Sequence, residues 1–163
     1  MRHLTRYETP ETQGPQNDVR NEICKTFRLL WDKNPWGNVG INTMFRDLND
    51  TPVLLADVRV RNVDHNTYPT IMIGVPDGWV PAMKMLDWLD EHELSGFPIA
   101  YVHGFTDGIY FCPIRRELKR FVRVNHGGRT DRDDPADSGS CVYIPTAYFK
   151  PVKDLDRLIG RPA

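Results

Sequence analysis

Charged side chains form a row on one face of the extended segment 53–61. Alternate residues of a β-strand point to opposite faces, so Asp57, Arg59 and Arg61 share a face that begins apolar at Val53 and Leu55. The opposite face is apolar throughout. This pattern predicts a strand that is buried at its start and opens into a cleft at its end. The alternative is an ordinary solvated polar face.

Two further carboxylates could join Asp57. Asp47 lies ten residues before it, across a turn that ends at Pro52, and Glu22 belongs to an earlier helical segment. Magnesium prefers oxygen ligands and often combines one or two carboxylates with a substrate phosphate. Such a cation stabilises the charge that develops on a scissile phosphate and activates the attacking water. Glu22, Asp47 and Asp57 are therefore candidate ligands for Mg²⁺ or Mn²⁺.

The hydrophobic periodicity predicts the elements that would position these groups. Residues 1–16 are polar and aperiodic and are expected to form an extended arm, and residues 17–163 one domain. Asn17 or Asp18 is the expected N-cap of the first helix. The expected elements are a helix to about residue 31, strands at 41–46, 53–61 and 70–75, a helix at 78–94, and strands at 99–105 and 109–114, joined by a hairpin turn at 106–108. Residues 114–163 are expected to form a β-rich appendix, with strands at 121–124 and 141–144 and a short helix near 152–158.

Glu22, Asp47 and the segment Asp57-Val58-Arg59 together resemble the signature of the PD-(D/E)XK nucleases, also called restriction-endonuclease-like. Residues 67–73 and 104–110 are similar to a pattern in small phage-encoded members, and the resemblance covers about residues 17–114. It implies a mixed α/β (α+β) core of a helix, three strands, a helix and two strands. It also implies that the two aspartates bind the metal and that Glu22 assists.

The sequence departs from the family's pattern at two positions. Arg59 stands where the family has lysine, and Arg46 precedes Asp47 where the family has proline. Arginine stays protonated and cannot act as a base, but it can donate hydrogen bonds to a phosphate. Two functions are consistent with these residues. One is a metal-dependent DNA nuclease, or a degenerate nuclease-fold protein that binds DNA, with Arg59 on the scissile phosphate. The other is a catalytically inactive phage accessory, structural or protein-interaction module that keeps the fold.

A basic stretch supplies further candidate phosphate contacts. The formal net charge of the 163-residue chain is −1, so affinity for nucleic acid must come from a local patch. Basic residues that neutralise phosphates release counterions, although a solvated surface is an equally reasonable interpretation. The candidate nucleic-acid contacts are Arg61, Arg115, Arg116, Lys119, Arg120 and Arg123.

Other features point to an ordinary cytoplasmic protein. Cys24, Cys112 and Cys141 are scattered, which favours buried thiols in a reducing compartment over disulfides or zinc. The sequence shows no apolar leader segment and no run of about 18 apolar residues, so the expected location is the host cytoplasm or a virion, with no membrane partner. DNA and a phage or host protein are the expected partners. His103 is expected to be a hydrogen-bonded core residue, and the acidic loop at 127–139 an ordinary surface loop.

Overall fold

The computed structural model describes residues 10–37, 40–73, 80–125 and 139–160. The helices and strands are α1 (Pro10–Phe27), β1 (Leu30–Lys33), β2 (Thr43–Arg46), β3 (Pro52–Val60), β4 (Thr70–Ile73), α2 (Val80–Glu91), β5 (Ile99–Phe105), β6 (Gly108–Pro113), β7 (Val122–Asn125), β8 (Gly139–Pro145), β9 (Lys150–Pro151) and α3 (Leu155–Leu158). Short 3₁₀ helices, η1 (Arg116–Phe121), η3 (Thr146–Tyr148) and η4 (Val152–Asp154), connect the later elements.

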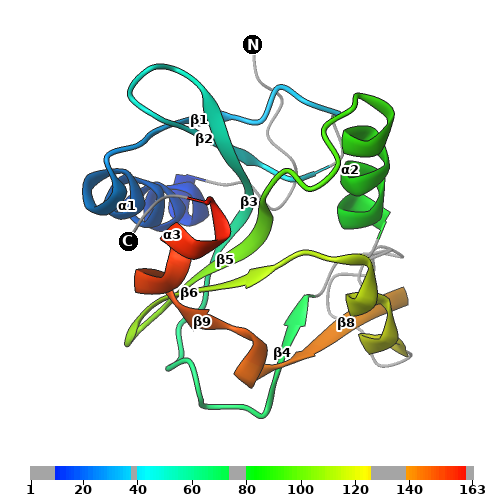
Figure 1. Cartoon of the computed structure of the whole chain (residues 1–163). Coiled ribbons are helices and arrows are strands. Elements are labelled where there is room, and N and C mark those ends of the chain that lie inside the picture. Colours follow the sequence, from blue (N-terminus) through cyan, green and yellow to red (C-terminus); the bar gives the residue numbers. More distant parts are fainter. Residues whose placement is uncertain (1–9, 38–39, 74–79, 126–138, 161–163) are drawn as a thin grey trace.

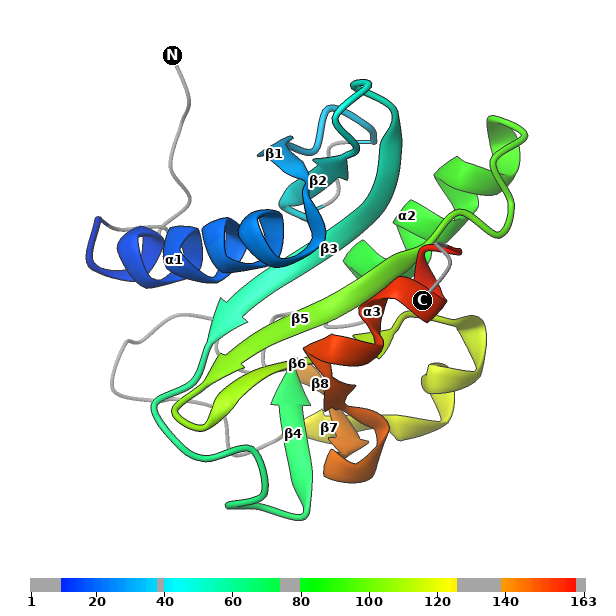
Figure 2. The same ribbon diagram turned by 60° about the vertical axis from the view of Figure 1, so that its left-hand side comes forward.

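The described strands form two sheets. The larger has the order β1-β2-β3-β5-β6-β9, in which β3 and β5 are parallel and their other neighbours are antiparallel. The smaller has the order β4-β8-β7 and is antiparallel. Figures 1 and 2 show α1 on one side of the large sheet and the small sheet on the other. The arrangement confirms the predicted mixed α and β architecture, with the appendix contributing most of the small sheet.

Two apolar clusters occupy the two faces of the large sheet. The first packs α1 and α3 against the face that carries Leu54, Ala56 and Val58 of β3. The second packs α2 and the small sheet against the face that carries Leu55 and Tyr101. The alternation predicted for β3 is therefore correct, because each of its faces is buried against a different layer.

The first helix differs from its prediction at both ends. It begins at Pro10, so the expected arm is helical from there to residue 16; residues 1–9 lie outside the described residues. Asn17 is no N-cap, since its side-chain oxygen accepts a hydrogen bond from Nη1 of Arg20 at 2.8 Å. The helix ends at Phe27 because Arg28 takes a positive φ of 55° and the Leu29 amide bonds the Cys24 carbonyl, a left-handed helix cap.

Strand β1 has no counterpart among the predicted elements. Leu30 and Trp31 continue the helical spacing of apolar residues, but they pair with Arg46 and Phe45 of β2. A four-residue edge strand with mostly exposed side chains carries too little alternation to be recognised from sequence.

The remaining elements lie close to their predicted places. The strand predicted at 70–75 corresponds to β4, which belongs to the small sheet. Residues 74–79 lie outside the described residues, and they include the first two residues of the predicted second helix. Glu93, with φ of 59°, turns the chain just after α2, close to the predicted end of this helix at residue 94. No described helix is long and apolar enough to cross a membrane.

The described cysteines are free thiols. Cys112 is buried and Cys24 is partly buried, and burial raises the pKa of these thiols to about 12 and about 11. Raised pKa values keep both as unreactive thiols. The side chain of Cys141 lies outside the described residues, as does the acidic loop up to residue 138.

Candidate functional site

The predicted row of charged side chains lies on the face of β3 that is turned toward α2 and the small sheet. Asp57 is buried and Arg59 is partly buried, with 8 % and 27 % of their side chains exposed. Nε and Nη2 of Arg59 donate to Oδ2 of Asp57 at 3.3 and 3.2 Å. The charge of the Asp57 carboxylate, together with the hydrogen bond that it accepts from Arg59, raises the pKa of Arg59 although burial opposes the shift. Asp57 therefore holds Arg59 in place.

Arg61 adds a second guanidinium to this row. Its Nη2 donates to the Met72 carbonyl of β4 at 2.6 Å, whereas its Nε is buried and has no hydrogen-bond partner among the described residues. Burial, followed by repulsion from Arg59, lowers the pKa of Arg61 to about 10, so it remains charged at neutral pH. Two guanidiniums and one carboxylate leave an excess positive charge at the end of β3, which favours an anion.

Strand β5 places two more polar side chains beside the row. Its parallel register sets Tyr101 next to Asp57 and His103 next to Arg59. The Tyr101 hydroxyl and both ring nitrogens of His103 are buried and find no hydrogen-bond partner in the described part of the chain. The expectation of a hydrogen-bonded His103 is wrong, because Phe105 and Phe149 pack around its ring. Together, Asp57, Arg59, Arg61, Tyr101 and His103 are named the central polar cluster.

Asp47 does not approach Asp57. The predicted hairpin exists, but Arg46 pairs with Pro52, so Asp47 begins the turn. Its Oδ1 accepts hydrogen bonds from the amides of Asn49 and Thr51 at 2.9 and 3.0 Å, and this side chain shapes the turn. The five residue-to-residue steps from Pro52 to Asp57 span about 16 Å along an extended strand. The register of the hairpin thus separates the two carboxylates.

Glu22 lies on the other side of the sheet. Helix α1 packs through Val19, Ile23 and Phe27 on the face opposite Asp57, and Glu22 is exposed. The buried Arg20 of α1 reaches β2, where its Nε donates to Oγ1 of Thr43 at 2.8 Å. The predicted convergence of Glu22, Asp47 and Asp57 is therefore wrong.

Asn42 occupies the place across the hairpin from Asp57. Thr43 pairs with Ala56, and the register continued by one residue sets Asn42 opposite Asp57. The side chain of Asn42 accepts from the Val58 amide at 3.1 Å and donates to the Val58 carbonyl at 3.3 Å, which extends the hairpin by one step. Sequence reasoning missed Asn42 because it searched for carboxylates; register counting from the hairpin turn would have located it.

These donors do not fit the predicted metal centre. Among the described residues, no group of three or more histidine, cysteine, aspartate or glutamate side chains could hold a metal ion. Asp57 is paired with a guanidinium, and a neutral amide stands opposite it. A divalent cation needs anionic oxygen ligands to replace its hydration, and adjacent arginines repel it.

The predicted basic stretch is divided among different environments. Arg115 and Lys119 are exposed. Arg116, although exposed, bonds Asp87 at 2.9 Å and Asp90 at 2.8 Å on α2, so its charge is largely balanced. Arg120 lies over the rings of Phe121 and Tyr148. Arg123 is on β7, and its side chain lies outside the described residues.

Comparison with solved structures identifies the class of fold. The chain superposes on a nuclease from a fusselovirus, D212, with a TM-score of 0.53 and 11 % sequence identity, covering 97 % of this chain and 95 % of that one. At this identity the match shows only that this chain and that nuclease share a fold. No curated protein matches the sequence.

Comparison with protein families places the chain more narrowly. The family model of phage putative PDDEXK endonucleases matches residues 3–152. The chain belongs to this family, which confirms the resemblance inferred from its sequence.

Proposed function

We propose that this protein is a nuclease-family member that binds nucleic acid at the central polar cluster without a catalytic metal. Arg59 and Arg61 contact a backbone phosphate at the end of β3, and Asp57 orients Arg59. The observation that carries the proposal is the ion pair between Asp57 and Arg59, which uses the carboxylate that the family's pattern would give to the metal.

Electrostatics supports phosphate as the ligand. Arg59 and Arg61 repel each other, and a phosphate between them would relieve that repulsion. Arg59 keeps 27 % of its side chain exposed, so part of this residue is open to solvent. Arginine donors in a fixed orientation bind phosphate oxygens more strongly than neutral donors do.

The family relationship favours a second candidate, a metal-dependent nuclease in which Asp57 leaves Arg59 and binds Mg²⁺ or Mn²⁺. Cleavage of DNA in Mg²⁺ or Mn²⁺ separates the two candidates. The proposed function predicts salt-dependent binding by the wild-type protein and no cleavage. Metal-dependent cleavage that Asp57→Asn abolishes, while Asp50→Asn does not, would establish the second candidate instead.

The arginines have a matched control. Arg59→Gln is expected to weaken DNA binding and to lower the slope of log K against log salt by about 0.7 to 0.9, the value for one lost phosphate contact. Arg46→Gln removes an arginine that is also partly buried, 24 % exposed, and also paired with an aspartate, but at the hairpin turn. An equal loss from both variants would contradict a specific role for Arg59.

A restoring variant tests the missing metal site directly. The double variant Asn42→Asp, Arg59→Lys would place two carboxylates opposite each other. It would also remove the guanidinium that forms an ion pair with Asp57. We expect this double variant to bind Mn²⁺ in calorimetric titration, whereas the wild-type protein gives no heat of binding. Equal Mn²⁺ binding by both proteins would show that the wild-type donors already suffice.

A further inference from the structure

A patch of exposed aromatic and cationic side chains lies on the small sheet and the segments beside it. Tyr68, Met72 and Tyr148 have 61 %, 40 % and 36 % of their surfaces exposed, which is unusual for such large apolar groups. Arg120 and Phe121 lie next to Tyr148. These three residues, Arg120, Phe121 and Tyr148, are named the tyrosine–arginine surface; Tyr68 and Met72 are exposed on the neighbouring loop and strand β4.

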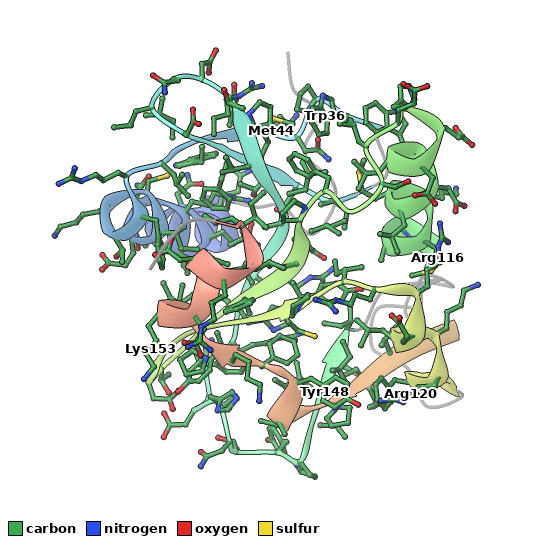
Figure 3. All side chains as sticks on the ribbon, in the orientation of Figure 1. Trp36, Met44, Arg116, Arg120, Tyr148 and Lys153 are labelled. Carbon is green, nitrogen blue, oxygen red and sulfur yellow. The ribbon has the colours of Figure 1, made fainter. Side chains whose placement is uncertain are left out.

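Contacts within the patch hold its rings in fixed positions. The rings of Phe121 and Tyr148 meet edge to face with centroids 5.3 Å apart. The guanidinium of Arg120 lies 4.8 Å from the centroid of Phe121 and 5.8 Å from that of Tyr148, and it also donates to the Tyr148 hydroxyl. Figure 3 shows Arg120 and Tyr148 side by side at the lower edge of the molecule. The patch is thus preorganised, which reduces the entropy lost when a ligand binds.

The tyrosine–arginine surface is linked to the central polar cluster. Thr146 bonds the carbonyls of Tyr68 and Pro69, which ties the loop before β4 to the 3₁₀ helix that carries Tyr148. On β4, the Met72 carbonyl accepts from Arg61 of the cluster. A ligand that contacts Arg61 therefore lies close to strand β4.

We propose that the tyrosine–arginine surface binds the bases of single-stranded nucleic acid, with Tyr148 as a stacking platform and Arg120 as a phosphate contact. This inference rests on the proposed function, whose phosphate site it extends. Exposed rings beside an arginine bind single strands because every base has a stacking face, while the cation attracts the backbone. A duplex hides those faces in its own stack, so the patch favours the single strand.

Fluorescence anisotropy with matched oligonucleotides tests the inference. The probes are a labelled oligothymidylate of about 15 nucleotides, within the usual range of site sizes, its abasic counterpart of equal length and charge, the corresponding oligouridylate, and a duplex. Tighter binding to oligothymidylate or oligouridylate than to the abasic strand and the duplex supports stacking. Equal affinity for the abasic strand, or preference for the duplex, overturns it.

Substitutions at Tyr148 assign the effect to the patch. Tyr148→Ala is expected to weaken oligothymidylate binding by about fivefold to a hundredfold, the range for one lost stacking contact, and to leave abasic binding unchanged. Tyr148→Phe keeps the ring and should stay within about twofold of the wild type on the same scale. Leu48→Ala removes a side chain that is 65 % exposed at the β2–β3 turn and serves as the control. Unchanged affinity in Tyr148→Ala overturns the inference.

Two further readouts keep the outcomes separate. Circular dichroism tests whether Tyr148→Ala is folded. If it is not, Arg120→Ala, which removes an exposed side chain, takes its place and is expected to weaken binding of the base-containing strand severalfold. Unchanged binding by Arg120→Ala would then overturn the inference. Loss of binding in Arg59→Gln with no effect at Tyr148 overturns this inference alone. Failure of the wild-type protein to bind any oligonucleotide overturns the proposed function as well.

Discussion

At the scale of single residues, the buried side chain of His103 lowers the stability of the fold. Its ring is fully buried, and neither nitrogen has a hydrogen-bond partner among the described residues. Burial, with smaller contributions from Arg61 and Arg59, lowers the pKa of His103 well below its usual value. The ring is therefore neutral at neutral pH, and protonating it inside the fold is unfavourable.

This burial predicts a loss of stability in acid. The pKa of this histidine is lower in the folded than in the unfolded state. The free energy of unfolding is therefore unaffected at pH values above the unfolded-state pKa of about 6.5. As the pH falls below that value, the unfolded chain takes up the proton first, so the free energy of unfolding decreases by up to about 1.4 kcal/mol per pH unit. Urea denaturation at pH 7 and pH 5 measures this loss. His103→Leu should show a smaller decrease, and an unchanged decrease would contradict the assignment.

Three polar side chains near Asp57 and on the neighbouring strand bond to protein groups. Asn42 lies opposite Asp57, Arg20 of α1 reaches Thr43, and Arg59 pairs with Asp57. Thr43 in turn donates to the Asn42 side chain at 2.7 Å. Each of these side chains forms hydrogen bonds where a metal site would need an anionic oxygen.

At the level of elements, the close approach of α1 to β5 depends on Gly104. A Cβ atom on Gly104 would lie 2.5 Å from Cγ2 of Val19, far inside van der Waals contact. The absence of a side chain lets the helix lie directly on the sheet, which fixes the height of α1 above β3 and β5. Glycine in a strand often marks such a close approach.

Gly104→Ala is therefore expected to destabilise the protein by about 1 to 3 kcal/mol through overpacking. Adding Val19→Ala should recover part of that loss, because it removes the methyl group that clashes. Gly14→Ala is the matched control: it lies in α1 with nothing within 4 Å of the added carbon, and it should stabilise the helix by about 0.5 to 1 kcal/mol. Thermal or urea denaturation measures all three, and a neutral Gly104→Ala would show that the helix shifts freely.

At the scale of the whole molecule, a nearly neutral chain places acidic side chains of α2 beside the basic side chain of Arg116 on η1. Asp87 and Asp90 of α2 face Arg116, and a hydrogen bond from Ser95 and one from Arg116 lower the pKa of Asp90. The exposed Lys119 on the same 3₁₀ helix is a candidate to contact phosphate. Nucleic acid should therefore contact the η1 side away from α2.

The salt dependence of nucleic-acid binding distinguishes the roles of Lys119 and Arg116. Lys119→Ala is expected to weaken single-strand binding and to lower the slope of log K against log salt by about 0.7. Arg116→Ala should leave both within error, because its charge is already balanced by two carboxylates. A larger effect at Arg116 would mean that DNA displaces the carboxylates and that the η1 path is wrong.

The sequence by itself determined the family, the two-faced strand β3 and most of the elements, because local periodicity and short motifs are encoded by neighbouring residues. It also placed Asp57 and Arg59 on the same face of that strand. It could not determine which residues meet them. The register of the hairpin, continued by one residue, sets Asn42 opposite Asp57. Parallel pairing of β3 and β5 sets Tyr101 and His103 beside Asp57 and Arg59. Helix α1 packs on the opposite face of the sheet, so Glu22 lies away from Asp57. Those relations depend on strand register and on which face a helix covers, both of which are decided by contacts between residues far apart in the chain.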